Sequence, residues 1–124
     1  MASIHKGVLT EGEDITYADI AVFKGIFAHR LGLLASALAE TNPPLAAHYR
    51  RFLCTNARVA IANASSSGKF AARWQGPINV SAPPCERRSS GVKQVRCDSA
   101  PGPAAQTSAL LLLATAAQAN SSSV

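Results

Sequence analysis

The strongest constraint on the fold is an apolar repeat that runs without interruption between residues 20 and 38. Large apolar residues recur there at three- and four-residue steps, at Phe23, Phe27, Leu31, Leu34 and Leu38. Residues three and four apart share one side of an α-helix, so this spacing predicts a long helix with that side turned toward a core. Neighbouring apolar residues widen the side, which is typical of a central helix packed by several others. We therefore expect an all-α fold.

Glycines and prolines indicate how this helix is packed and where it ends. Gly25 and Gly32 lie in its interior, where each glycine costs about 1 kcal/mol relative to alanine. We expect them to mark close approach by a neighbouring helix. The helix should end near Asn42, because Pro43-Pro44 cannot continue it. Pro44 is suited to the first turn of a following helix.

The start of the same helix carries a complete capping sequence. Thr16 is suited to be the N-cap and Asp19 stands three residues later, so their side chains can satisfy two backbone N–H groups reciprocally. Ile15 and Ile20 flank this capping box as a hydrophobic staple. These four residues form the one site predicted from the sequence, and its role is structural.

The string Thr-Tyr-Ala-Asp-Ile-Ala-Val-Phe at residues 16–23 resembles the core-helix start in the C-terminal, all-helical domain of the cytosolic glutathione S-transferases. Residues 44–52 are similar to the family's next helix, and residues 58–65 resemble its last conserved helix. The resemblance covers residues 12–69, a little over half of the chain. The family usually places a proline before that last helix; Asn56, which stands there in this chain, is expected to cap it.

This resemblance implies half of an enzyme. Glutathione transferases pair the helical domain with an N-terminal thioredoxin-like domain, which binds the co-substrate glutathione and activates its thiol. A βαβ unit needs about 30 residues, whereas only eleven precede Gly12. We therefore expect the thioredoxin-like domain to be absent, and we assign no catalytic, cofactor-binding or metal-binding residue. Whether the chain is an enzyme is left open.

Composition restricts the class of protein further. The formal net charge is +5, but the basic residues are scattered and Trp74 is the one indole, so nucleic-acid binding is not expected. Residues 1–10 have no apolar core of signal-peptide length. The apolar run at 109–117 is too short to cross a bilayer and is interpreted as a short helix. We expect a cytoplasmic protein without a membrane partner.

The character of the chain changes after about Phe70. Proline, serine and glycine dominate residues 76–103, and helical periodicity disappears. We interpret residues 70–124 as a largely disordered tail that follows a lead-in at 1–11 and the helical region at 12–69. The tail does not resemble the corresponding part of glutathione transferases, so we consider it an unrelated extension from an alternative exon or a shifted frame.

Cysteines and histidines suggest no chemistry. Cys54, Cys85 and Cys97 form no close pair, and the three histidines have no spacing for a helical metal couple. An odd cysteine count and a cytoplasmic location predict reduced thiols. Cys54 is interpreted as a small buried residue.

Two functions remain open. In the first, the chain is a glutathione-transferase C-terminal-like domain related to glutathione metabolism, inactive alone as a truncated form, with apolar helix faces left exposed for a protein partner or a second copy. In the second, it is a non-catalytic interaction module of the kind found in translation-factor and aminoacyl-tRNA synthetase complexes.

Overall fold

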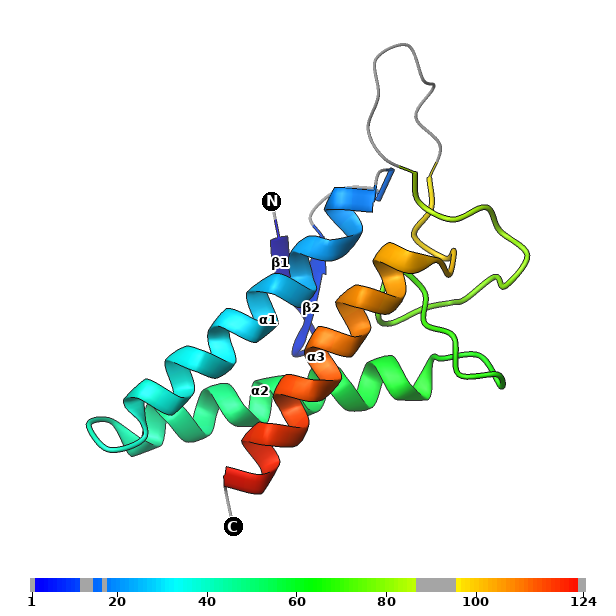
Figure 1. Cartoon of the computed structure of the whole chain (residues 1–124). Helices are drawn as coiled ribbons and strands as arrows, with labels where there is room; N and C mark the ends of the chain where they lie inside the picture. The colour runs from blue at the N-terminus through cyan, green and yellow to red at the C-terminus, as the bar shows by residue number, and fades with distance from the viewer. Residues whose placement is uncertain (1, 12–14, 17, 87–95, 123–124) are drawn as a thin grey trace.

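Three helices make up most of the fold, which is all-α in character as predicted. A computed structural model describes residues 2–11, 15–16, 18–86 and 96–122. Its helices are α1 (Ala18–Leu38), α2 (Pro43–Ala62) and α3 (Pro103–Ser122), and two short strands, β1 (Ala2–His5) and β2 (Val8–Glu11), precede them. Helix α3 lies beside α1 and also packs on α2 (Figure 1).

The strands form an antiparallel hairpin in the segment that the sequence suggested was only a lead-in. Ala2 pairs with Glu11 and His5 with Val8, so Lys6 and Gly7 form the turn. Both turn residues have positive φ, 52° and 78°, as in the tight turns that match the twist of a two-stranded ribbon. The hairpin packs against α1 and α2 through β2.

Helix α2 joins two segments that we predicted as separate helices. The Asn42 side chain caps its start by accepting from Leu45 N–H at 3.4 Å. Pro44 lies in the first turn as expected, and Pro43 lies there as well. The predicted break at Asn56 is wrong. Asn56 is 1 % exposed, inside the helix, and its amide holds the hairpin instead of capping a new helix.

Three hydrogen bonds occupy the Asn56 side chain. Oδ1 accepts from the Leu9 N–H at 2.8 Å, and Nδ2 donates to the carbonyls of Gly7 at 3.2 Å and Phe52 at 2.9 Å. A buried amide is stable only when its polar atoms are paired, and here the hairpin backbone supplies two of the three partners. Asn56 therefore connects α2 to the N-terminal strands.

The prediction of a largely disordered tail is wrong for the part of it that the structure describes. Residues 103–122 form α3, which extends the short helix expected at 109–117. Gln106 of α3 accepts from the Phe70 N–H at 3.1 Å and donates to the Phe70 carbonyl at 2.8 Å. The irregular segments before α3 also pair, since Ala72 N–H donates to the Ala100 carbonyl at 3.1 Å. The tail was predicted to be disordered because alanine and serine give no apolar periodicity, although they can pack well against another surface of small residues.

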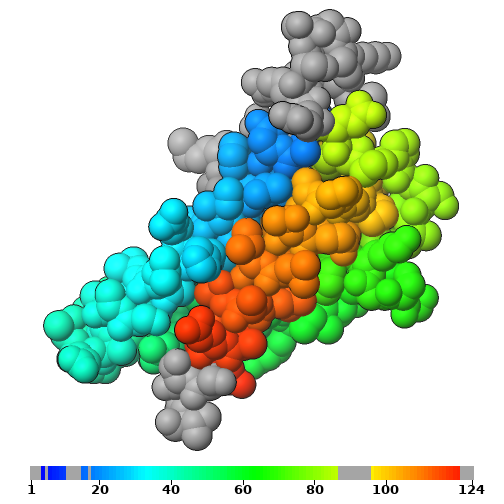
Figure 2. All heavy atoms as spheres, viewed as in Figure 1, coloured from blue at the N-terminus to red at the C-terminus, as the bar shows by residue number. Residues whose placement is uncertain are grey.

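Helices α1 and α3 meet along small side chains, and Figure 2 shows them side by side. A Cβ at Gly25 would lie 2.6 Å from the Ser108 Cα, and one at Gly32 would clash with the Thr115 methyl. The prediction that these glycines mark close helix approach is confirmed. We call this contact the small-residue seam; it includes Gly25 and Gly32 of α1 and Ser108 and Thr115 of α3.

The predicted core-facing side of α1 is therefore mostly wrong. Leu31 is buried, but Phe23, Phe27 and Leu34 are 58 %, 48 % and 45 % exposed. Large side chains cannot enter a contact in which Ser108 approaches the Gly25 backbone so closely. The glycines of α1 contact α3, whereas Phe23, Phe27 and Leu34 remain exposed.

Candidate functional site

The residues of the predicted capping site lie where α1 meets the segments that precede α3. Ile15 is fully buried, and Ile20 packs against the cluster that contains it, so the two staple residues share one apolar cluster. Helix α1 begins at Ala18, whose N–H donates to the Glu86 carbonyl at 2.8 Å. Thr16 is half-buried and Asp19 is exposed. Their reciprocal capping stays a prediction, because Tyr17 between them lies outside the described residues.

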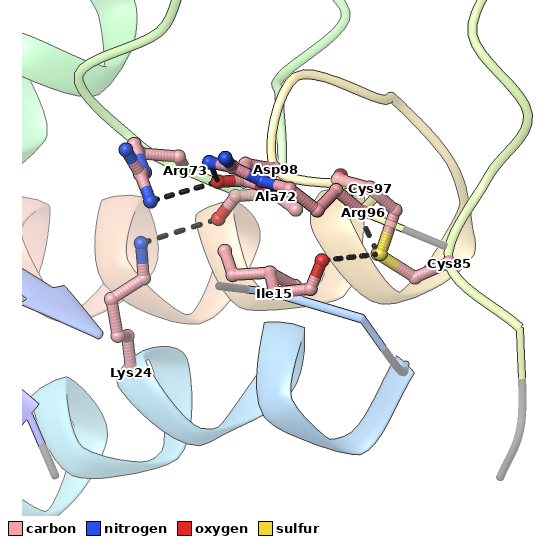
Figure 3. Close-up of a disulfide and its surroundings, with 8 residues drawn as sticks. All are labelled: Ile15, Lys24, Ala72, Arg73, Cys85, Arg96, Cys97 and Asp98. Carbon is pink, nitrogen blue, oxygen red and sulfur yellow. Dashed lines mark hydrogen bonds and ion pairs between the residues drawn. A yellow bond between two sulfur atoms is a disulfide. The ribbon is translucent and has the colours of Figure 1, made fainter. Parts of the chain in front are cut away.

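A disulfide lies next to Ile15 (Figure 3). Cys85 and Cys97 are bonded, and the Cys97 N–H donates to the Ile15 carbonyl at 2.7 Å. The prediction of reduced thiols is wrong for this pair, because the fold brings together two cysteines that twelve positions separate in the sequence. Cys54 is a free thiol, and it is half-buried on α2 instead of fully buried.

Beside the disulfide, two arginines share one carboxylate. Asp98 accepts from Arg96 at 2.7 Å and forms an ion pair with Arg73 at 2.8 Å. Burial raises the pKa of Asp98, but hydrogen bonds from Arg96 and from the backbone, together with both positive charges, outweigh it and hold the pKa below its ordinary value of 3.8. The carboxylate is therefore ionised and fixes the segment just before α3.

Lys24 of α1 is buried in the same region. Its Nζ donates to the Ala72 carbonyl at 3.2 Å and lies 4.4 Å from the centre of the Trp74 ring, which is itself buried. A buried ammonium needs such partners, because desolvation without compensation is costly. Figure 3 shows Lys24 reaching from α1 toward the loop that carries Ala72 and Arg73. Lys24 thus ties α1 to the segment that was predicted to be disordered.

The cluster around the disulfide is an assembly of structural contacts. Within the described ranges, no group of three or more His, Cys, Asp or Glu side chains could hold a metal ion. Sequence reasoning missed Lys24, Trp74 and Asp98 because each contacts a residue more than twenty positions away in the sequence, and only the folded loops bring these partners together. One signal was available, since Lys24 is a single lysine amid the apolar residues of a long helix.

The exposed surface of α1 is the second candidate, and it is apolar. We call it the apolar face; it consists of Phe23, Ile26, Phe27, Leu33 and Leu34, which are between 44 % and 58 % exposed. At 100° per residue, the five positions fall within an arc of about 120°, roughly opposite the small-residue seam. Helix α1 is therefore apolar on two opposite sides, and only one of them is covered by the rest of the described chain.

Comparisons with protein family models, with curated proteins and with solved structures find no match to this chain. Among the described residues, α1 is long and apolar enough to cross a membrane by length and composition, a property that the core helix of a soluble protein also has.

Proposed function

We propose that this chain is a non-catalytic helical domain of the glutathione-transferase C-terminal type, and that the apolar face of α1 docks a thioredoxin-like, glutathione-binding domain. The observation that carries the docking is the five large, half-exposed apolar side chains on one side of one helix. The sequence resemblance over residues 12–69 supports the identity of the partner. In this proposal the chain alone does not conjugate glutathione, because the thiol-activating residue belongs to the partner.

The size of the apolar face suits the centre of an interface. Aromatic side chains bury about 150–250 Å² each and aliphatic ones less, so five large apolar residues at roughly half exposure present on the order of 400 Å². This area lies within the range of the largest patch on a typical monomer, which is often functional. A standard interface buries about 800 Å² on each partner, so a rim of polar residues around the face completes it.

The charge within the face favours a different protein over a second copy. Arg30 is exposed and falls in the middle of the arc, between Phe27 and Leu34 along the helix. In a symmetric dimer centred on this face, the two Arg30 guanidiniums would approach each other, which is unfavourable. A partner with a carboxylate opposite Arg30 is complementary in charge as well as in apolarity.

Charged residues of α1 make a lipid bilayer an unfavourable partner for the apolar face. Arg30 lies near the middle of the 21-residue helix and Lys24 a third of the way along it, so a helix that crossed a membrane would carry both charges into the bilayer at a cost. Lys24 is committed to Ala72 and Trp74, and α3 covers the opposite side of α1. A protein surface can instead pair Arg30 and cover the apolar side chains together.

The decisive experiment mixes the purified chain with the isolated thioredoxin-like domain of a glutathione transferase and measures their affinity by calorimetry. Phe23→Ser and Phe27→Ser should each weaken binding about tenfold or more, as aromatic hot spots do. Leu110→Ser is the matched control, because Leu110 is 60 % exposed on α3 and outside the apolar face. It should leave the affinity unchanged.

A conjugation assay completes the test. The chain alone should be neither retained on a glutathione resin nor active, and turnover should appear only with the partner domain. Equal binding by wild-type and Phe27→Ser chains would refute the docking face. Binding to a translation-factor or synthetase subunit, with none to the thioredoxin-like domain, would support the interaction-module alternative. Sedimentation of the chain with phosphatidylcholine vesicles, abolished by Phe27→Ser, would assign the face to a membrane.

A further inference from the structure

Helix α2 lines a cavity of about 620 Å³, which the docking proposal does not use. We call it the arginine pocket. Its lining includes Arg50, Arg51, Cys54, Thr55 and Arg58 of α2, together with Asn120 of α3. Along the helix, Arg50, Cys54 and Arg58 follow one another at four-residue steps, and Arg51 and Thr55 form the neighbouring row. Two adjacent rows of one helix thus place three guanidiniums around one cavity.

No Asp or Glu among the described residues lines this pocket. Helix α2 contains no Asp or Glu, and the residues that line the cavity include none. Within the described ranges, Arg50, Arg51 and Arg58 form no ion pair, whereas Arg73 and Arg96 share Asp98. The C-terminal end of α3 contributes the negative end of a helix dipole, roughly half a charge against three. The pocket therefore has a net attraction for anions.

We propose that the arginine pocket binds the di- or polyphosphate group of a small molecule. Guanidinium groups form paired hydrogen bonds to phosphate oxygens, and their strength exceeds that of neutral hydrogen bonds. Eight helical residues span about 12 Å, so Arg50 and Arg58 flank a ligand longer than one phosphoryl group. The Thr55 hydroxyl and the Asn120 amide add neutral donors at the same cavity.

The composition of the lining favours a small molecule over a nucleic-acid strand. Proteins that bind single strands combine a positive groove with aromatic side chains on which bases stack, and the lining of this pocket contains no aromatic residue. The volume lies in the range of about 300–1,000 Å³ that small-molecule sites occupy. The arrangement is thus that of a phosphate-binding pocket without a base-stacking platform.

Calorimetric titration of the full chain with inorganic pyrophosphate tests the proposal. Arg51→Gln and Arg58→Gln change exposed residues and should leave helical circular dichroism unaltered. Each should weaken pyrophosphate binding about tenfold or more, because each removes a charge-assisted hydrogen bond. Lys69→Gln is the matched control, since it removes one exposed positive charge outside the pocket and should leave the affinity within twofold.

Cys54 provides an independent reading of where the anion binds. It is the free thiol of the chain and it lines the pocket, so saturating pyrophosphate should slow its alkylation by iodoacetamide several-fold. Failure of pyrophosphate to bind, or binding that neither protects Cys54 nor responds to Arg58→Gln, would overturn the site. Citrate binding as tight as that of pyrophosphate would overturn the preference for phosphate. An oligonucleotide that binds more tightly per site than pyrophosphate would overturn the assignment to a small molecule.

Discussion

Substitution of the two glycines of the small-residue seam tests two kinds of contact between α1 and α3, one with backbone atoms and one with a side chain. A Cβ at position 25 meets the Ser108 Cα at 2.6 Å and the Ser108 carbonyl oxygen at 2.7 Å. Both are backbone atoms, so Gly25→Ala can be accommodated only if the helices move apart by about 1 Å to reach ordinary contact distance. A Cβ at position 32 instead meets the methyl group of Thr115, a side-chain atom that a second substitution can remove.

The magnitudes follow from two opposing terms. Alanine in place of glycine stabilises a helix by about 1 kcal/mol, whereas overpacking a closely fitted contact destabilises the fold by about 1–3 kcal/mol. Moving α1 and α3 apart destabilises the fold further, because dispersion contacts between them are lost. We expect Gly25→Ala to lower the free energy of unfolding by on the order of 2 kcal/mol, or roughly 8 °C in Tm for a chain of this size. Gly32→Ala should destabilise as well, and Thr115→Ala should rescue it.

Thermal and urea denaturation, followed by circular dichroism, would measure these effects in a double-mutant cycle. Ser108→Ala removes a buried hydroxyl that has no hydrogen-bond partner in the described structure, so it should not reduce stability by itself, and it should not rescue Gly25→Ala. Ser36→Ala, at an exposed position of α1, controls for helix propensity. If Gly25→Ala proved as stable as the wild-type protein, the close approach of α1 and α3 would be refuted.

Three further predictions concern other parts of the fold. Asn56→Ala should destabilise the fold by about 1–3 kcal/mol and speed amide exchange at Leu9, because the buried Leu9 N–H loses the Asn56 oxygen as its acceptor. Unchanged exchange at Leu9 would contradict the connection between Asn56 and the hairpin. The pKa of Asp98 is lower in the folded state than its ordinary value of 3.8. The ionised carboxylate therefore stabilises the fold above pH 3.8, and this contribution is lost as the pH falls through the lowered folded-state pKa. Asp98→Asn should therefore flatten stability against pH on the acid side, and an unaltered acid limb would rule this out. Thr16→Ala and Asp19→Ala should each cost about 1 kcal/mol, and unchanged helicity and Tm in both would disprove the capping box.

The sequence predicted which segments are helical better than it predicted how they pack. Proline chemistry located the start of α2, and the interior positions of Gly25 and Gly32 indicated a close neighbour before that neighbour was known. The identity of the neighbour was missed. Residues 103–122 are rich in alanine, and their contact with α1 includes the small residues Ser108 and Thr115 against two glycines.

The buried side of α1 was predicted wrongly because the sequence does not show which helix packs against it. Periodicity shows that apolar residues share a side, but α1 has two apolar sides, one small and one large, and only the partner helix decides which is buried. Asn56 was misread for a related reason. An asparagine between helical segments is typical of a cap, and its partners Gly7 and Leu9 lie more than forty residues earlier in the sequence.

The pairing of α1 with α3 has a consequence for how the protein acquires its structure. Gly25 and Ser108 lie 83 positions apart, so the two halves of their contact leave the ribosome at different times. During synthesis α1 is complete long before the last helix exists, and its glycine-lined groove stays open in the meantime. Contacts between such distant segments slow the final step of folding and leave the nascent chain exposed to misassociation. A polypeptide that stopped before residue 103 would keep that groove open permanently, and it would become a target for chaperones and proteases.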